Sequence, residues 1–144
     1  MSEILSFAAV YSRTPSVASF VSTLQTSGWC ADCGTGSVVY SDSCNDLTEE
    51  KSAPVESLPR VLSSFQKRLE RAQQSGIDLN HASVGVVFFA FLPGHDAYTI
   101  EAIFPPDFGQ SDTGFDMSMP PRLLLGAVRA ASPSLLSYAC TVTR

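Results

Sequence analysis

Residues 83–92, SVGVVFFAFL, decide the fold, because they form a nearly continuous apolar run that Pro93 and Gly94 bring to an end. The length of this run and its valine and phenylalanine content favour a buried central strand. Gly94-His95-Asp96 resembles a hairpin turn, and residues 97–104 follow it with apolar side chains at alternate positions. We therefore predict two neighbouring strands in the middle of a sheet.

The chain before this run predicts a strand followed by a helix. Residues 3–11 carry apolar side chains on both faces, which indicates another strand inside the sheet. Thr14 and Pro15 then form the pattern of an N-cap followed by proline at the first helical position. Gly28 provides the helix stop. The apolar residues between them at helical spacing are Val17, Phe20, Val21 and Leu24.

Two further helices and two further strands complete the predicted order. Cap-and-proline signals open helices at residues 58–74 and 118–131, and residues 37–40 and 135–143 have strand patterns. The order is β-α-(β)-α-β-β-α-β. It indicates an α+β fold, with a mixed or antiparallel sheet covered on one face by about three helices. We expect a variant of the ferredoxin-like arrangement.

The composition fits a single domain that spans residues 1–144. Hydrophobic residues make up 44% of the chain and charged residues 16%, which is ordinary for a globular protein with a proper core. Glu3 stands where a secretory signal would carry a positive charge, and the longest apolar run is too short to span a bilayer. We therefore expect a soluble, cytoplasmic protein.

The charge balance bears on the class of partner. The formal net charge of the chain is −5. Such a surface repels polyanions, so binding to nucleic acid or to an anionic membrane is disfavoured. A basic protein partner is favoured.

The cysteines leave a second class of function open. Cys30-x-x-Cys33 follows Trp29, and Cys44 lies further along the chain. These three thiols would suit a thiol-redox site or three zinc ligands, with Cys140, His81 or His95 as a distant fourth ligand. The sequence after Cys33 is a poor helix start, however, and a second pair of metal ligands is missing. We therefore expect no metal and no cofactor, with the cysteines acting as small apolar residues.

The sequence contains no catalytic signature. Gly34-x-Gly36 is too short for a dinucleotide loop, and no Walker pattern is present. His95-Asp96 would suit a general base and its orienting acid, but no nucleophile elbow accompanies the pair. We therefore predict a protein that is not an enzyme.

Two segments are rich in acids, residues 32–56 and residues 96–116, and both have aromatic residues in or beside them. Both segments fall mainly in predicted loops. Long loops on a rigid sheet are where binding residues concentrate, because acids steer a partner and exposed aromatics anchor it. The alternative to a binding site is a surface whose acids only keep the protein soluble. The residues that we predict to bind a partner are Trp29, Asp42, Asp46, Glu49, Asp107, Phe108, Asp112, Phe115 and Asp116.

The acid-and-aromatic loops at residues 105–108 and 114–116, together with size, acidity and α+β order, resemble small immunity proteins of bacterial toxin systems. The resemblance covers the whole chain as a style, without a residue-by-residue motif. It implies occlusion, in which acidic loops cover the basic active site of a protein toxin, such as one that acts on nucleic acid or nucleotides. An accessory subunit that uses a sheet edge or the basic face of the helix at residues 58–74 is a third alternative.

Overall fold

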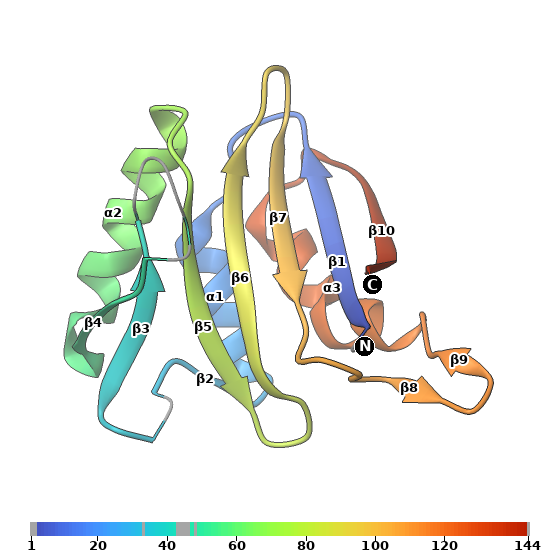
Figure 1. The fold of residues 1–144 in the computed structure, drawn as a ribbon. Coiled ribbons are helices and arrows are strands. Elements are labelled where there is room, and N and C mark those ends of the chain that lie inside the picture. The colour runs from blue at the N-terminus through green and yellow to red at the C-terminus, as the bar shows by residue number, and fades with distance from the viewer. Residues whose placement is uncertain (1–2, 33, 43–46, 48, 144) are drawn as a thin grey trace.

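The protein has an α+β fold built on one large antiparallel sheet (Figure 1). A computed structural model describes residues 3–32, 34–42, 47 and 49–143. Within these residues the sheet has eight strands, seven of them in the order β10-β1-β7-β6-β5-β3-β4, while β2 pairs with β5. The strands of this sheet are β1 (Ile4–Tyr11), β2 (Trp29–Cys30), β3 (Ser37–Ser41), β4 (Lys51–Pro54), β5 (Ser75–His81), β6 (Gly85–Pro93), β7 (Tyr98–Ile103) and β10 (Leu135–Thr143).

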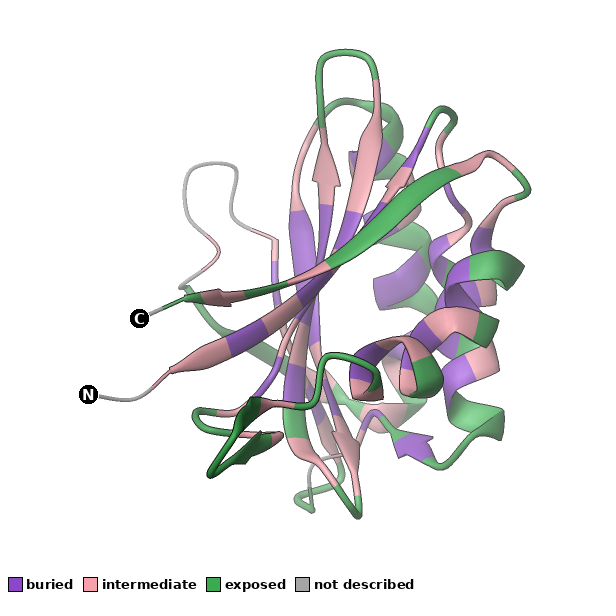
Figure 2. Cartoon of the chain, turned by 90° about the vertical axis from the view of Figure 1, so that its right-hand side faces the viewer, coloured by how far each residue is buried: buried purple, intermediate pink, exposed green. Residues whose placement is uncertain are grey.

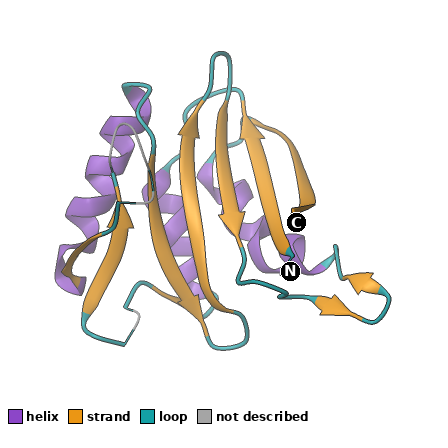
Figure 3. Cartoon of the chain, in the orientation of Figure 1, coloured by secondary structure: helices purple, strands orange, loops and turns teal. Residues whose placement is uncertain are grey.

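The helices of the described residues lie against one face of the sheet (Figure 3). The helix α1 (Val17–Thr26) packs against both α2 (Leu58–Glu70) and α3 (Met119–Ala131). A 3₁₀ turn, η1 (Val55–Ser57), leads into α2, and a small separate hairpin, β8 (Gln110–Ser111) and β9 (Gly114–Phe115), precedes α3. None of the helices among the described residues is long and apolar enough to cross a membrane.

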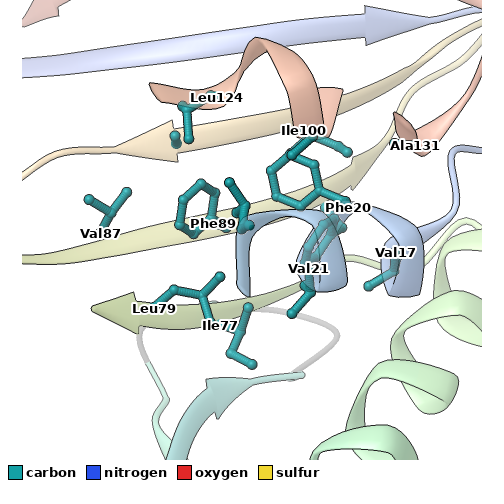
Figure 4. Close-up of a cluster of buried hydrophobic side chains, with 14 of the residues drawn as sticks. Val17, Phe20, Val21, Ile77, Leu79, Val87, Phe89, Ile100, Leu124 and Ala131 are labelled. Carbon is teal, nitrogen blue, oxygen red and sulfur yellow. The ribbon is translucent and has the colours of Figure 1, made fainter. Parts of the chain in front are cut away.

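The core lies between the sheet and the helices, as the alternation in the strands predicts. Successive side chains of a strand point to opposite faces, so every second residue of β6 and β7 meets the helices. Phe20 of α1 lies among them (Figure 4), with its ring centroid 5.5 Å from that of Phe89 and 5.9 Å from that of Phe91. Full burial of one such side chain stabilises the fold by about 2 to 3 kcal/mol.

The prediction of an α+β fold with helices on one face of an antiparallel sheet is confirmed, while the ferredoxin-like order is not. The largest difference is β5, which we did not predict. Residues 75–81 follow the end of α2 closely, and the sequence analysis assigns no element between the helix predicted at residues 58–74 and the strand at residues 83–92. The sheet therefore has an additional long strand beside β6, and its order differs from a ferredoxin-like one.

Two helix ends also differ from the prediction. The N-cap of α1 is Ser16, whose side chain accepts a hydrogen bond from the Ser19 N–H, so the helix begins at Val17 and Pro15 precedes the cap. The helix α2 ends at Glu70, four residues before the predicted Gln74, because Ala72 adopts a left-handed backbone with φ of 58°. The turn brings the Gln73 N–H to the Arg68 carbonyl, at 2.8 Å.

One buried polar contact connects the sheet to α3. The Tyr11 hydroxyl donates a 2.7 Å hydrogen bond to the Val128 carbonyl, and Tyr11 itself is fully buried. Burial raises the pKa of Tyr11 well above its usual value, so the phenol keeps its proton and remains a donor at physiological pH. This bond connects α3 directly to β1.

Replacing Tyr11 with Phe should lower the free energy of unfolding by about 1 to 2 kcal/mol, because the buried hydrogen bond is lost while the ring is kept. Chemical denaturation followed by circular dichroism measures this. Tyr138→Phe is the matched control, since Tyr138 is 43% exposed. Equal effects of the two changes would contradict the role given to the Tyr11 hydroxyl.

Candidate functional site

The face of the sheet opposite the helices, which we call the open face, carries a groove of about 530 Å³. Side chains of β3, β5, β6 and β7 form its floor, and Leu47 and Glu50 from the connection between β3 and β4 line it from above. Its apolar lining side chains are Val39, Leu47, Phe88, Ala90, Leu92 and Ile103. An apolar groove of this volume falls in the range of ligand and peptide sites.

Strand pairing places the polar and small residues of the groove. In one row across the sheet, Asp78 lies opposite Phe88. In the next row, Gly76 lies opposite Ala90, and Ala90 lies opposite Glu101 of β7. Two small residues, Gly76 and Ala90, therefore lie in the row next to Phe88 on this face of the sheet.

Three carboxylates line the same groove: those of Glu50, Asp78 and Glu101. Among the described lining residues there is no lysine, arginine or histidine to neutralise them. Burial, and secondarily the negative charge of Glu50, raise the pKa of Asp78 to about 6. A cation bound in the groove would stabilise the ionised carboxylate of Asp78, because its positive charge would compensate both the burial and the neighbouring negative charge.

The position of the Phe88 ring in the groove depends on residue 76 being glycine, which has no Cβ. A Cβ built on Gly76 would lie 2.2 Å from Cζ of Phe88 and below 3.0 Å from two further ring atoms. The ring therefore lies directly on the glycine backbone. Any larger residue at position 76 would therefore force the Phe88 ring to move.

The predicted binding residues of the first acidic segment differ in their exposure and in their contacts. Trp29 is 3% exposed and packs against Phe89 and His81, with ring centroids 5.4 Å and 5.0 Å away. Our expectation of an exposed aromatic anchor is therefore wrong for Trp29, because β2 turns its side chain toward the core. Asp42 forms a 2.6 Å ion pair with Lys51, and Glu49 is exposed beside Glu50. Asp46 lies outside the described residues.

The predicted residues of the second segment surround β8 and β9. The Phe108 ring stacks on Phe104 at 5.1 Å, and Phe115 packs partly against the core. Both rings thus support the loop, and neither is an exposed anchor. Asp112 is exposed in the turn between β8 and β9.

The other two acids of this segment serve the loop itself. One carboxylate oxygen of Asp107 accepts the Glu3 N–H at 3.0 Å. Hydrogen bonds from Ser118, with a weaker contribution from Arg122, lower the pKa of Asp116. The described residues of the two predicted acidic segments form separate surfaces, because β3 and β4 lie at one side of the sheet and β8 and β9 at the other (Figure 1).

The cysteine alternative gains no support from the described residues. Cys30 is exposed on β2, whereas Cys140 lies on β10 at the far edge of the sheet. Five strand spacings separate these strands, a distance on the order of 20 Å. Cys140 is therefore excluded as a fourth ligand with Cys30. Cys33 and Cys44 lie outside the described residues, which contain no cluster of three or more metal-ligating side chains.

The histidines do not act together either. His81 and His95 lie at opposite ends of β6, because His81 pairs with Gly85 and His95 follows Pro93. His81 accepts the Ser83 N–H at its Nδ1, at 3.1 Å, and contacts Trp29. Its role among the described residues is to close the turn and cover the Trp29 ring.

Sequence reasoning missed Asp78 because it missed β5. The signal was present in residues 77–80, where apolar Ile77 and Leu79 alternate with polar Asp78 and Asn80. Glu50 and Glu101 are far apart in the sequence, and no local pattern connects them with each other. Comparison of the chain with protein-family models, with curated proteins and with solved structures finds no match.

Gly76→Ala should destabilise the protein by about 1 to 3 kcal/mol, because the Phe88 ring has to leave its place on the glycine. The matched control is Gly126→Ala, at a helical position with no neighbour within 4 Å, which should be neutral or slightly stabilising. Adding Phe88→Ala to Gly76→Ala should cost less than the sum of the two single changes, and strict additivity in denaturation experiments would refute the contact.

Asp78→Asn should stabilise the protein at pH 8 by about 1 kcal/mol, a value discounted because water still screens part of the carboxylate. The folded-state pKa of about 6 lies above the reference value of 3.8. The folded state therefore binds more protons between these values, so the wild type loses stability as the pH rises through this window. Near pH 4 the advantage of the variant should disappear.

Thermal unfolding of the wild type and of Asp78→Asn across pH 4 to 8 measures this difference. Asp112→Asn, which removes an exposed carboxylate, is the control and should change stability little at either end. A constant difference between the wild type and Asp78→Asn across the range would show that the carboxylate is not held in an unfavourable environment.

Proposed function

We propose that the protein is a non-enzymatic binding protein of the immunity type, which holds and occludes a basic protein, a toxin, at the acidic groove of the open face. The observation that carries this proposal is the apolar groove with Glu50, Asp78 and Glu101 in its lining, on the face opposite all described helices. The resemblance in style to toxin-immunity proteins makes a basic toxin the partner to test first.

The chemistry of the groove suits lysine or arginine side chains of a partner. These side chains have an aliphatic stem and a charged end, so they cover apolar surface and reach carboxylates at the same time. The Phe88 ring and the aliphatic residues would contact the stem. The carboxylates would receive the cation, with charge-assisted hydrogen bonds stronger than neutral ones.

The unfavourable position of Asp78 supports a binding role. Burial raises its pKa, so the ionised carboxylate costs stability in the unbound protein at neutral pH. Perturbed groups of this kind concentrate at functional sites, where a ligand compensates the cost. Binding of a cation should therefore be strongest above pH 6 and should weaken as the pH falls below that value.

The charge of the molecule is divided between its two sides. Helix α2, on the face away from the groove, carries a basic surface formed by Arg60, Lys67, Arg68 and Arg71. The acidic residues of the groove are therefore not neutralised by these cations. Such a division orients an approaching basic partner toward the open face.

The turn between β8 and β9 offers a second contact for the same partner. Asp112 lies exposed there, while Asp107 and Asp116 shape the loop through their hydrogen bonds to Glu3 and Ser118. Of the predicted acids in this segment, Asp112 is thus the one best placed to meet a partner. We assign it a role in steering, which adds to the rate of association more than to affinity.

Reversing two groove acids, Glu50→Lys with Glu101→Lys, should weaken binding of the basic partner at least tenfold, about 1.4 kcal/mol. The partner is isolated by affinity capture on the tagged wild-type protein from lysate of its own cells, and affinities are then measured by titration calorimetry at two salt concentrations. The wild-type complex should weaken with salt, and the complex of the double variant should depend on salt less steeply.

The matched control reverses two exposed acids outside the groove, Glu70→Lys with Asp96→Lys, and produces the same change in net charge. This variant should keep most of the affinity. Asp112→Lys alone tests the second contact. Equal losses for the groove variant and the control would show that net charge, not the groove, determines binding, and a captured partner that is acidic would refute the proposed function.

A further inference from the structure

The two edges of the large sheet differ in how they are protected. The edge strand β4 has four residues and contains Lys51 and Pro54, which discourage pairing with another chain. The opposite edge strand, β10, has nine residues, LLSYACTVT, with no charge and no proline. Figure 2 shows most of β10 exposed at this edge. Long uncharged edges of this kind are templates for a further strand.

The hydrogen-bond pattern identifies the backbone groups that point away from the sheet. The Leu5 carbonyl accepts from the Phe104 N–H, on the β7 side of β1. Because these directions alternate along an antiparallel strand, Ser6, Ala8 and Val10 direct their backbone groups toward β10. Their opposite residues in β10 are Thr141, Ala139 and Ser137. The N–H and C=O groups of Tyr138, Cys140 and Val142 therefore point outward.

A register shift separates Leu136 from the regular part of β10. Val10 lies opposite Ser137, while Tyr11 lies opposite Leu135, so Leu136 is an extra residue in this strand. The regular segment is residues 137–143. Its middle residue is Cys140, and the outward-pointing residues Tyr138 and Val142 lie symmetrically on either side.

We propose that this outer edge of β10 pairs antiparallel with β10 of a second copy of the chain, about a two-fold axis at Cys140, and joins the two sheets into one. In this register Tyr138 of each copy lies opposite Val142 of the other, and Cys140 lies opposite Cys140. All six outward backbone groups of each strand then find a partner, so no shifted symmetric register pairs more of the segment.

The side chains of the segment are complementary to themselves in this register. On the face toward the helices, the Tyr138 ring would meet Val142 of the second copy, an aromatic and β-branched pair that stabilises a cross-strand contact. On the open face, Ser137 would meet Thr143, and Ala139 would meet Thr141. No like charges oppose each other, because the segment carries none.

The exposed apolar residues support this surface. The large hydrophobic side chains that are exposed in the described residues include Met117, Leu136 and Tyr138. Met117 lies beside β10, since its carbonyl accepts a 3.5 Å hydrogen bond from the Cys140 thiol. Apolar side chains are thus exposed on and beside β10, and a second copy paired at residues 137–143 would shield Tyr138 from water.

Sedimentation equilibrium of the wild-type chain at about 10 to 200 µM tests the proposal, and it should show a monomer–dimer equilibrium. Tyr138→Lys should raise the dissociation constant of the dimer at least tenfold, because it places charges in the paired strand. The control is Val86→Lys, at a strand residue of equal exposure, 44% against 43%, on β6. Circular dichroism confirms that both variants fold. A wild type that stays monomeric at 200 µM overturns the proposal.

The register is tested by cysteine cross-linking. In the proposed pairing, Ala139 of one copy lies opposite Thr141 of the other, so a mixture of Ala139→Cys and Thr141→Cys chains should form a mixed disulfide dimer under mild oxidation. Each variant alone should form at least fivefold less disulfide through its introduced cysteine, and peptide mass spectrometry distinguishes this disulfide from one between two Cys140 residues. Equal cross-linking in all samples would overturn the register at Cys140.

Discussion

The rest of the structure depends on the contact between β6 and the helices. Phe89 and Phe91 point from the central strand into a group of aromatic rings that includes Phe20 of α1 and Phe65 of α2. Trp29 and Tyr40 extend the group at its margins. These six rings come from five elements, since Phe89 and Phe91 belong to β6 and the others to α1, α2, β2 and β3. The positions of α1, α2 and β2 relative to the sheet therefore follow from one cluster.

The helices cover one face of the sheet, and the open face has a different chemical character. The side chains of β6 that point away from the helices, Phe88, Ala90 and Leu92, are still apolar. Small residues and the Phe88 ring shape them into a groove, and three carboxylates make that groove acidic. A carboxylate held partly out of water beside another one costs stability, as the raised pKa of Asp78 shows. Such a group is not expected where stability alone is selected, and it supports the binding function that we propose for the groove.

The proposed dimer and the proposed binding groove use separate parts of the sheet. The groove lies over β3, β5, β6 and β7, whereas the proposed dimer contact lies at β10, beyond β1. Pairing at β10 would therefore leave both grooves accessible, on the same face of one continuous sheet. A dimer of this kind would present two acidic, cation-binding grooves to a partner, and so would increase the apparent affinity for a partner that is itself dimeric.

The sequence by itself determined the class of fold, the central strands and the helices, because hydrophobic periodicity and proline and glycine signals are local properties. Residues 83–92 were identified as a central strand, and the helices were found with errors of a few residues at their ends. Only the tertiary structure decided which acids share a site. Asp78, Glu50 and Glu101 are far apart in the chain and meet because β5, the connection after β3 and β7 surround one part of β6. The burial of Trp29 was decided in the same way, since a short strand can direct a side chain to either face and only its pairing with β5 selects one.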